Sequence, residues 1–552
     1  MTKQGAFTFV LHSHLPYTRR AGRWPHGEEW LHEAAAETYV PLLDHLNALR
    51  QEGVPARLTL GLTPILVEQL ADEDVRRNFL QYLDLRIQAA GEDVIRFESQ
   101  RKTHFAYLAG YYRDWYSRVR ESFLERYDGN LVPAFRTLQD AGLIEIVTCA
   151  ATHGYLPLLD RDESIHLQLH TAVESYMQHF GQAPRAIWLP ECAYRPAYHA
   201  SDGRIRPGLE DFLQEYGLKL FFSETHMIEG GNPVGVAAGD AIGPYGAITR
   251  RYVVPFSQAA HSEPASTHRP YYVSKPEVAV IGRNNRTGLQ VWSAEWGYPG
   301  EYDYREFHKK DGVSGMQYWR VTGPQVDLAQ KEAYHPDWAA HKVGLHAGHF
   351  ANLVEEITRE CWQTSKGEFG IVSANYDTEL FGHWWFEGVD WLQAVLRRLS
   401  GSKVVDLTTA SDFLEAHAPQ TVVHIPEGSW GAGGAHFVWD NADTGWMWPV
   451  VHEAEWRMLQ MVQSPPAQNG ANDPVLNQAA RELLLLQSSD WPFLVTTGQA
   501  KEYAIERFEQ HLGRFTALLD SIDRQAPDHE LAAILWEKDK VFPGIDWRWF
   551  HQ

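Results

Sequence analysis

The amino-acid sequence predicts an α/β protein built on a parallel sheet, either open or closed into a barrel. Short apolar segments recur along the chain, and most are followed by a Pro or Gly turn and a helical pattern. Several segments are apolar at every position, as expected for strands that are buried on both faces. The predicted strands are AFTFVLHS, RLTLGL, LIEIVT, AIWL, LKLFF, LQVWS, FGIVSA and KVVDL. Periodicity alone leaves open whether seven or eight strands form a barrel.

Three regions depart from this strand–helix alternation. Residues 76–140 form a charged helical pattern that is too long for one crossover, which predicts an inserted helical subdomain within a catalytic unit of residues 1–417. Residues 226–290 are rich in Gly and Pro and predict a lid-like excursion, because long loops in compact domains are usually functional or disordered. Residues 418–552 begin with a Gly/Trp-rich loop and continue as amphipathic helices, which predicts a C-terminal helical domain.

Composition limits the classes of function. The chain has 552 residues, which is too many for one hydrophobic core. The net charge of −22 disfavours nucleic acid and anionic membranes as partners and favours a neutral substrate. Three cysteines lie far apart without a CxxC pair, which is typical of a reducing cytoplasm. No signal peptide or run of 18 apolar residues occurs, so we expect a cytoplasmic monomer that does not bind membranes.

Polar side chains follow several predicted strands at the point where each strand ends. His12 and His14 are two residues apart on the first strand, so they point to the same side of it. His153 follows the third strand, Glu191 follows the fourth, and Asp377 follows the stretch FGIVSA. Because the carboxyl ends of parallel strands meet at one edge, where ligands bind in such folds, we expect these five residues to form one site.

Two kinds of chemistry fit this group of residues. Histidines and carboxylates at strand ends bind zinc in many barrel hydrolases, but no HxxEH or CxxC motif supports a metal here. The second possibility is a glycosidase-type carboxylate pair, Glu191 and Asp377, with the histidines binding sugar hydroxyls and the 21 tryptophans including platforms for sugar rings. It explains the acids, histidines and aromatic residues together, and it needs no metal or other cofactor.

Five stretches resemble, in order, the motifs of glycoside hydrolase family 57 and particularly those of its α-1,4-glucan branching enzymes. They are HSHLP, ATHGYLP, WLPECAY, YDTELFGHWWFEG and QAARELLLLQSSDWPFL, within residues 12–493. Each stretch alone is unspecific, but five in order cover nearly the whole chain. The resemblance implies a distorted (β/α)7 barrel with an inserted helical subdomain and a C-terminal all-helical domain that contributes to a glucan cleft.

The resemblance also implies roles for individual residues. Glu191 would be the nucleophile and Asp377 the general acid/base of a retaining reaction that cleaves α-1,4 bonds and forms α-1,6 branches in amylose, amylopectin or glycogen. His12, His14 and His153 would surround the donor sugar. Further glucan contacts would come from Arg283, Gly300, Trp430, Asp490, Gln499, Trp30, Trp292 and Trp439. Tyr245, at the tip of GDAIGPYGAIT, would belong to a mobile lid that excludes water.

Other functions remain open at this point. A 4-α-glucanotransferase or an α-amylase-like hydrolase would use the same carboxylates, and a zinc-dependent barrel hydrolase would use the histidines. A glucan-binding protein without activity is a further possibility, although intact Glu191 and Asp377 argue against it. Residues 256–281 and 302–340 match the family only in patches, so their contacts are unassigned.

Overall fold

The computed structural model describes residues 3–23, 25–200, 203–233, 242–243, 246–247, 265–293, 297–323, 325–468 and 470–551. Its centre is a ring of mostly parallel strands from two sheets, joined by backbone hydrogen bonds. In chain order these strands are β1 (Gly5–Ser13), β2 (Leu58–Leu62), β3 (Ile144–Val147), β4 (Ala186–Ile187), β7 (Leu220–Ser223), β11 (Ala279–Gly282) and β12 (Gly370–Asp377).

Two groups of parallel strands join to make this ring. One group runs β12–β1–β2–β3 and the other runs β11–β7–β4. The Trp188 N–H donates to the Thr148 carbonyl at 2.8 Å, which connects β3 to β4. The Asn284 N–H donates to the Ser373 carbonyl at 2.9 Å, which connects the end of β11 to β12. The ring of seven strands confirms the predicted distorted (β/α)7 barrel. The barrel is distorted at these two junctions, where few backbone hydrogen bonds join the neighbouring strands.

Seven further strands in the described residues are two or three residues long. They are β5 (Tyr198–His199), β6 (Ile205–Arg206), β8 (Ile242–Gly243), β9 (Gly246–Ala247), β10 (Tyr271–Val273), β13 (Val405–Leu407) and β14 (Val422–Val423). Strand β13 pairs with the first residues of β1, as the predicted KVVDL strand requires. Strand β10 pairs with β14, so the chain after residue 417 returns to the barrel before its helices begin.

Two predictions about the middle of the chain are wrong. The stretch LQVWS is part of helix α10 (Asn285–Trp292), because the Asn284 side chain accepts a hydrogen bond from the Thr287 N–H at 3.0 Å and caps a helix there. The barrel strand is β11, in residues 226–290, where the sequence predicted only an excursion. This strand is four residues long and buried, which gives a weak signal beside many Gly and Pro residues. Tyr245 lies outside the described residues.

Helices cover the outside of the barrel. They are α1 (Glu28–Ala34), α2 (Val40–Gln51), α3 (Pro64–Ala71), α6 (Leu131–Asp140), α7 (Asp162–Phe180), α8 (Leu209–Glu215), α9 (Thr225–Glu229), α10, α11 (Pro336–Thr364), α12 (Gly388–Ser400) and α13 (Ala410–Ala416). Between β1 and these helices, Phe9 stacks on Phe350 of α11 with ring centroids 5.9 Å apart. Trp391 of α12 meets Phe350 edge-on at 4.8 Å. All three rings are fully buried.

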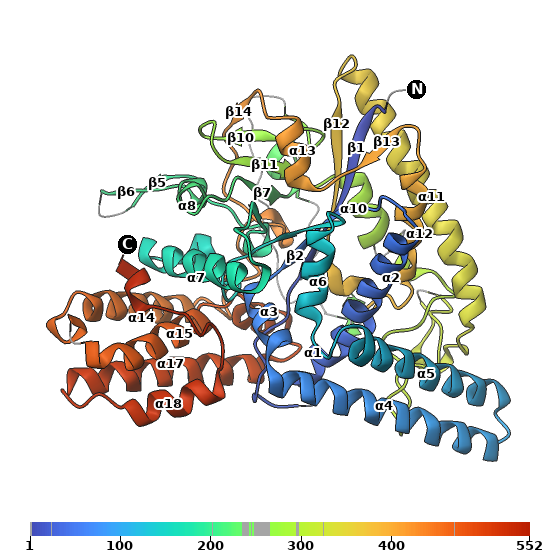
Figure 1. The fold of residues 1–552 in the computed structure, drawn as a ribbon, viewed down its shortest axis with the longest axis horizontal. Coiled ribbons are helices and arrows are strands. Elements are labelled where there is room, and N and C mark those ends of the chain that lie inside the picture. Colours follow the sequence, from blue (N-terminus) through green and yellow to red (C-terminus); the bar gives the residue numbers. More distant parts are fainter. Residues whose placement is uncertain are drawn as a thin grey trace.

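The segment 76–140 is helical, but it is not one continuous helix. Helix α4 (Glu73–Ser99) begins at Asp72, whose carboxylate accepts the N–H groups of Asp74 and Val75 at 2.9 and 3.0 Å. Helix α5 (Thr103–Glu121) packs back against α4 as an antiparallel pair at one side of the molecule (Figure 1). Helix α6 instead packs against α2, α3 and α7 on the barrel wall.

The C-terminal helices form a separate group (Figure 1, orange to red). They are α14 (Met447–Val462), α15 (Asp473–Leu486), α16 (Asp490–Thr497), α17 (Lys501–Asp523) and α18 (His529–Lys538). Helix α15 is buried along most of its length between α17 and α18. No helix in the described part of the chain is both long and apolar enough to cross a membrane.

We expect Phe350→Ala to lower the free energy of unfolding of the barrel by about 3–5 kcal/mol, because it leaves a cavity between β1, α11 and α12. Urea unfolding followed by tryptophan fluorescence measures this change. The control is Leu345→Ala on the same helix, whose side chain is 54% exposed and should change stability by less than about 0.5 kcal/mol. Equal effects of the two substitutions would contradict this packing.

Candidate active site

The carboxyl ends of β1, β3, β4 and β12 bring the predicted site residues together. His12 and Asp377 face each other in the β1–β12 register. The His14 ring stacks on the His153 ring with centroids 3.8 Å apart, and His12 Nε2 lies 3.1 Å from His153 Nε2. His153 Nδ1 lies 4.0 Å from Glu191 Oε1. The structure thus brings together residues that the sequence spreads over 365 positions.

Glu191 is held in an unusual backbone conformation. Its φ and ψ angles are 60° and 25°, and the next residue, Cys192, also has a positive φ of 50°. Left-handed conformations cost a residue other than glycine about 1–3 kcal/mol, and they persist where the surrounding structure holds them. Here the Trp430 N–H donates to the Glu191 carbonyl at 3.1 Å, and Trp430 Nε1 donates to the Glu191 carboxylate at 2.7 Å. Trp430 therefore fixes both the backbone and the side chain of Glu191.

Asp377 ends β12 among charged and polar neighbours. Arg283 directly follows β11 and pairs with Glu224, which follows β7, with Nη1 and Oε2 2.9 Å apart. The positive charge of Arg283 acts to lower the pKa of Asp377. Glu379, two residues further along, accepts hydrogen bonds from the His14 N–H at 3.2 Å and from the Tyr39 hydroxyl. Arg283 is engaged by the protein itself, so its position indicates a role in shaping the site.

Burial is the first cause of the pKa shifts in this cluster. It raises the pKa of Asp377 to about 7, against the effect of Arg283. It raises the pKa of Glu191 to about 8, and the charges of Asp377 and Asp490 add to this, whereas hydrogen bonds from Trp430 and Ser489 oppose it. Burial also lowers the pKa values of His12 and His153 well below 6.5, so both imidazoles are neutral near pH 7.

The C-terminal helical domain completes the site. At the start of α16, Asp490 Oδ1 lies 3.0 Å from His14 Nε2. The Ser489 hydroxyl lies 2.7 Å from His153 Nδ1, and the Ser489 N–H donates to the His153 carbonyl at 3.0 Å. His14 and His153 are thus oriented by residues more than 330 positions away in the sequence.

The outer residues predicted to bind glucan have different environments. Trp30 is 9% exposed and packs on Tyr503, and Trp292 is half-buried beside Trp384. Gly300 is exposed and Gln499 is half-buried in the turn between α16 and α17. Trp439 is fully buried and lies 4.5 Å from Tyr155 between ring centroids. A ring with no exposed face packs in the core, which does not support the predicted role of Trp439 as a sugar platform.

The sequence reasoning missed three residues at this site. Glu224 follows β7 directly, so the pattern of a polar residue at a strand end was present but unused. Ser489 precedes Asp490 in a predicted motif, and only the fold shows that it faces His153. Trp188 is fully buried and stacks on His12 with ring centroids 4.8 Å apart, a contact between distant strands that a single sequence does not encode.

The histidine cluster does not resemble a metal centre. Both ring nitrogens of His14 and of His153, and Nε2 of His12, are directed at another histidine or at hydroxyl and carboxyl groups. Within the described residues, the one set of three ligand atoms close enough to share a metal ion belongs to Glu482, His511 and Asp539. Arg507 Nη2 lies 2.9 Å from His511 Nε2, and Arg514 Nη1 donates to Asp539 Oδ2 at 2.6 Å, so two arginines already contact this set.

Comparisons with known proteins agree with the fold. The family model of glycosyl hydrolase family 57 matches residues 8–426, and the model of the 1,4-alpha-glucan branching enzyme C-terminal region matches residues 450–550. The chain therefore belongs to glycosyl hydrolase family 57. Within the family, the C-terminal match and the Thermococcus kodakarensis relatives described below group it with the 1,4-alpha-glucan branching enzymes.

Several relatives align over almost the entire chain. A 1,4-alpha-glucan branching enzyme of Thermococcus kodakarensis is 44% identical over 551 residues, which are 98% of this chain and 78% of the relative. The crystal structure of a branching enzyme from that archaeon gives a TM-score of 0.88 at 42% identity and covers 99% of this chain and 96% of its own. The alpha-amylase AmyC of Thermotoga maritima gives 0.81 at 30% identity, covering 99% of each chain.

We expect the purified enzyme to keep its activity on amylose in excess EDTA, because hydrogen bonds to protein groups, and not a metal ion, hold the site histidines in place. Metal analysis by mass spectrometry of the protein used in the assay provides the control. Zinc bound at one equivalent per chain, together with loss of activity on chelation, would show that the histidines are ligands.

Proposed function

We propose that Glu191 and Asp377 catalyse branching of an α-1,4-glucan by a retaining double displacement. The observation that carries this proposal is the buried carboxyl pair, one member of which accepts the Trp430 Nε1–H at 2.7 Å. The pair lies at the end of a barrel where ligands bind in α/β folds. The relatives that name α-glucan branching support the same substrate class.

In the first step, ionised Glu191 attacks C1 of an internal α-1,4-linked glucosyl unit. The C1–O4 bond breaks, and Asp377 gives its proton to the departing O4, so the reducing-side fragment leaves as a neutral alcohol. The product is a glycosyl ester on Glu191 and an ionised Asp377. His12 and His153, which are neutral near pH 7, line the donor-sugar site in this step.

In the second step, the 6-hydroxyl of a glucan takes the place of water. Asp377 removes its proton while O6 attacks C1, and the ester bond to Glu191 breaks. An α-1,6 branch forms and both carboxyl groups return to their starting states. A water molecule in place of O6 would give hydrolysis, so branching requires an acceptor chain and exclusion of water. We keep the assignment of Tyr245 to a lid as a prediction.

Burial keeps a proton on the carboxyl pair near neutral pH. With pKa values of about 8 for Glu191 and about 7 for Asp377, the two carboxyl groups together hold at least one proton near pH 7. Burial is the cause that raises the pKa of Asp377. The higher pKa of Glu191 places the shared proton on Glu191 in the protein without substrate, whereas the double displacement needs it on Asp377. Hydrogen bonds from Trp430 and Ser489 favour the ionised Glu191 that the reaction uses.

A hydrolase of the same fold is the second candidate. The likeness to the alpha-amylase AmyC, with a TM-score of 0.81, favours it because the catalytic carboxylates would be the same. The products distinguish the two functions. Amylose treated with a branching enzyme yields short chains on debranching with isoamylase, whereas a hydrolase or a linear transferase leaves no 1,6 bonds to cut.

We also infer the setting in which the enzyme works. Amylose, amylopectin and glycogen are the proposed partners, and the family's reaction supports them. The cysteines Cys149, Cys192 and Cys361 are all free, which suits a reducing cytoplasm. The monomeric state remains a prediction, and size-exclusion chromatography with light scattering would measure it.

We expect Glu191→Gln to lower kcat on amylose by about 10⁴-fold or more, because the variant cannot form the glycosyl ester. Asp377→Asn should lower kcat by about 10²–10⁴-fold through loss of proton transfer. Formation of isoamylase-sensitive chains measures both effects.

An activated donor separates the two roles. Fluoride leaves without protonation, so Asp377→Asn should still release fluoride from α-maltosyl fluoride, at least in a first turnover. Glu191→Gln should release none above background. Fluoride release by Glu191→Gln, or its absence with both variants, would contradict the assignment of roles.

We expect Trp430→Phe to shift the acidic limb of the pH profile of kcat/KM upward by about one pH unit. The Trp430 N–H stabilises the ionised carboxylate, so removing it raises the pKa of Glu191, at about 1.4 kcal/mol per unit. Trp439→Phe is the matched control, because the Trp439 ring is buried and its Nε1 does not contact Glu191. An acidic limb unchanged by Trp430→Phe would argue against this hydrogen bond.

A further inference from the structure

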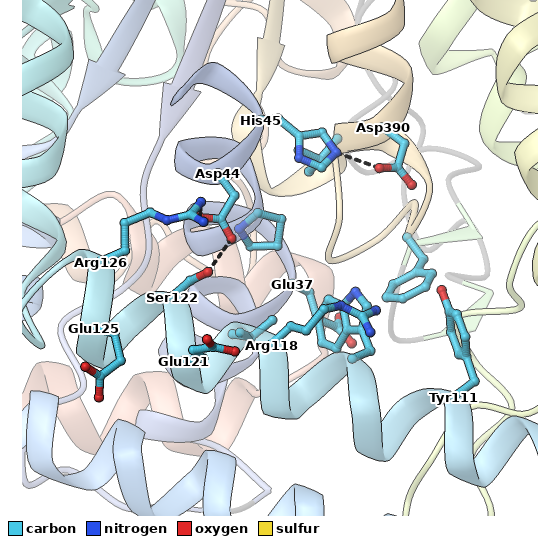
Figure 2. Close-up of a pocket in the computed structure, with 15 residues that line it drawn as sticks. Glu37, Asp44, His45, Tyr111, Arg118, Glu121, Ser122, Glu125, Arg126 and Asp390 are labelled. Carbon is cyan, nitrogen blue, oxygen red and sulfur yellow. Dashed lines mark hydrogen bonds and ion pairs between the residues drawn. The ribbon is translucent and has the colours of Figure 1, made fainter. Parts of the chain in front are cut away.

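A second cavity lies on the outer side of the barrel, between α2, α5 and α12. Its volume is about 680 Å³, which is within the usual range for ligand sites. Figure 2 shows that side chains from α2 and α5 converge on it, with Tyr111 and Asp390 at one end and Arg126 and Glu125 at the other. The residues proposed for catalysis do not line this cavity.

Two π-helical turns contribute to the lining. The π-turn η1 (Ala35–Tyr39) provides Glu37, and the π-turn η2 (Ser122–Arg126) provides Ser122 and Arg126. In the described part of the chain, these are the π-helical segments. Such turns are rare and occur frequently at functional sites, because they displace side chains from their regular helical positions. Because both π-helical turns line one cavity, they indicate that this cavity is a functional site.

The second turn is fixed to the opposite wall. Asp44 of α2 accepts hydrogen bonds from the Ser122 hydroxyl at 2.7 Å and from Arg126 Nη1 at 2.8 Å. The Tyr127 hydroxyl donates to the same carboxylate at 2.6 Å. At the other end, His45 Nε2 lies 2.6 Å from Asp390 Oδ1 and connects α2 with α12. The cavity is therefore formed before any ligand arrives.

Aromatic rings form one part of the wall. Tyr111 and Trp115 are four residues apart on α5, so they lie on the same face of the helix, and both are half-buried. Phe386 lies 5.3 Å from Trp115 between ring centroids, and the Arg305 guanidinium lies 3.9 Å behind the Phe386 ring. Arg305 is itself held by Glu37 through two hydrogen bonds of 3.0 and 3.1 Å. The rings are partly open and fixed in orientation, which suits stacking against a sugar.

Polar groups at the mouth offer both acceptors and donors. Arg118, Glu121 and Glu125 line the cavity with exposed or half-exposed side chains. In total, five carboxylates and two arginines line it, so a phosphate or another anion would meet net repulsion. A neutral ligand rich in hydroxyl groups can use acceptors, donors and flat apolar rings together.

We propose that this cavity is a second, non-catalytic binding site for an α-glucan chain. Tyr111 and Trp115 stack on glucosyl rings, and Arg118, Glu121 and Glu125 bind hydroxyls. The ligand class rests on the proposed function, in which the substrate is a polymer long enough to occupy two sites. Binding at this cavity retains a long chain while another segment of it, or a neighbouring chain, reacts at the barrel end.

The test uses the full chain with Glu191→Gln, which holds the catalytic site intact without turnover, and maltoheptaose as the probe. Isothermal titration calorimetry should show two binding sites per chain. Adding Trp115→Ala should remove one of them or weaken it at least fivefold, and Arg118→Ala, at an exposed position, should weaken the same site. Trp338→Ala is the matched control, because Trp338 is 47% exposed on α11 and outside the cavity.

A single binding site in the parent protein, or two sites unchanged by Trp115→Ala and Arg118→Ala, would overturn the proposal. Equal weakening by Trp338→Ala would also overturn it. Thermal melting of each variant checks that the chain is folded, and Arg118→Ala decides the outcome if Trp115→Ala does not fold. The proposed function is tested separately by the activity of Glu191→Gln, so a failure there is distinguishable from a failure here.

Discussion

The site depends on one hydrogen bond, from Trp430 Nε1 to the Glu191 carboxylate at 2.7 Å. These two residues are 239 positions apart, so the bond forms only when the Gly/Trp-rich segment after residue 417 folds back over β4. The same tryptophan holds the Glu191 backbone in a left-handed conformation that is unfavourable for a free residue. The barrel, the returning segment and the carboxylate orientation are therefore parts of one arrangement.

Burial makes this arrangement chemically useful. Near neutral pH, isolated carboxyl groups in water would both be ionised. Here the apolar surroundings raise both pKa values toward 7 and 8, and the charge of one group adds to the pKa of the other. Donors reach Glu191 from Trp430, while Asp377 lies beside the Arg283–Glu224 pair. Two similar carboxyl groups can thus take different roles because their neighbours differ.

Much of this could be predicted from the sequence because the signals are local. Strand ends carrying His12, Glu191 and Asp377 were visible as polar residues after apolar runs, and the barrel edge follows from parallel topology. Strand β11 was missed because four buried residues in a Gly- and Pro-rich region give little periodicity. The stretch LQVWS was misread because a helix with one buried face and a short strand look alike over five residues.

Contacts between distant segments could not be predicted from the sequence. The pairing of Ser489 with His153, and the burial of Trp439 against Tyr155, depend on how α14 to α16 pack on the barrel. Glu379 is similar, because its hydrogen bonds to Tyr39 and to the His14 backbone arise only when β1, η1 and β12 meet. The type of a residue indicates which chemistry it can perform, whereas the fold determines which residues it contacts.

The most direct test of the central claim is detection of the glycosyl-enzyme itself. The Asp377→Asn variant is incubated with α-maltosyl fluoride, quenched in acid and digested, and the peptides are sequenced by mass spectrometry. A maltosyl adduct on Glu191, which accumulates because the variant lacks the base that activates O6, is the predicted result. An adduct on a different residue, or turnover that gives an inverted product without any adduct, would contradict the double displacement through Glu191.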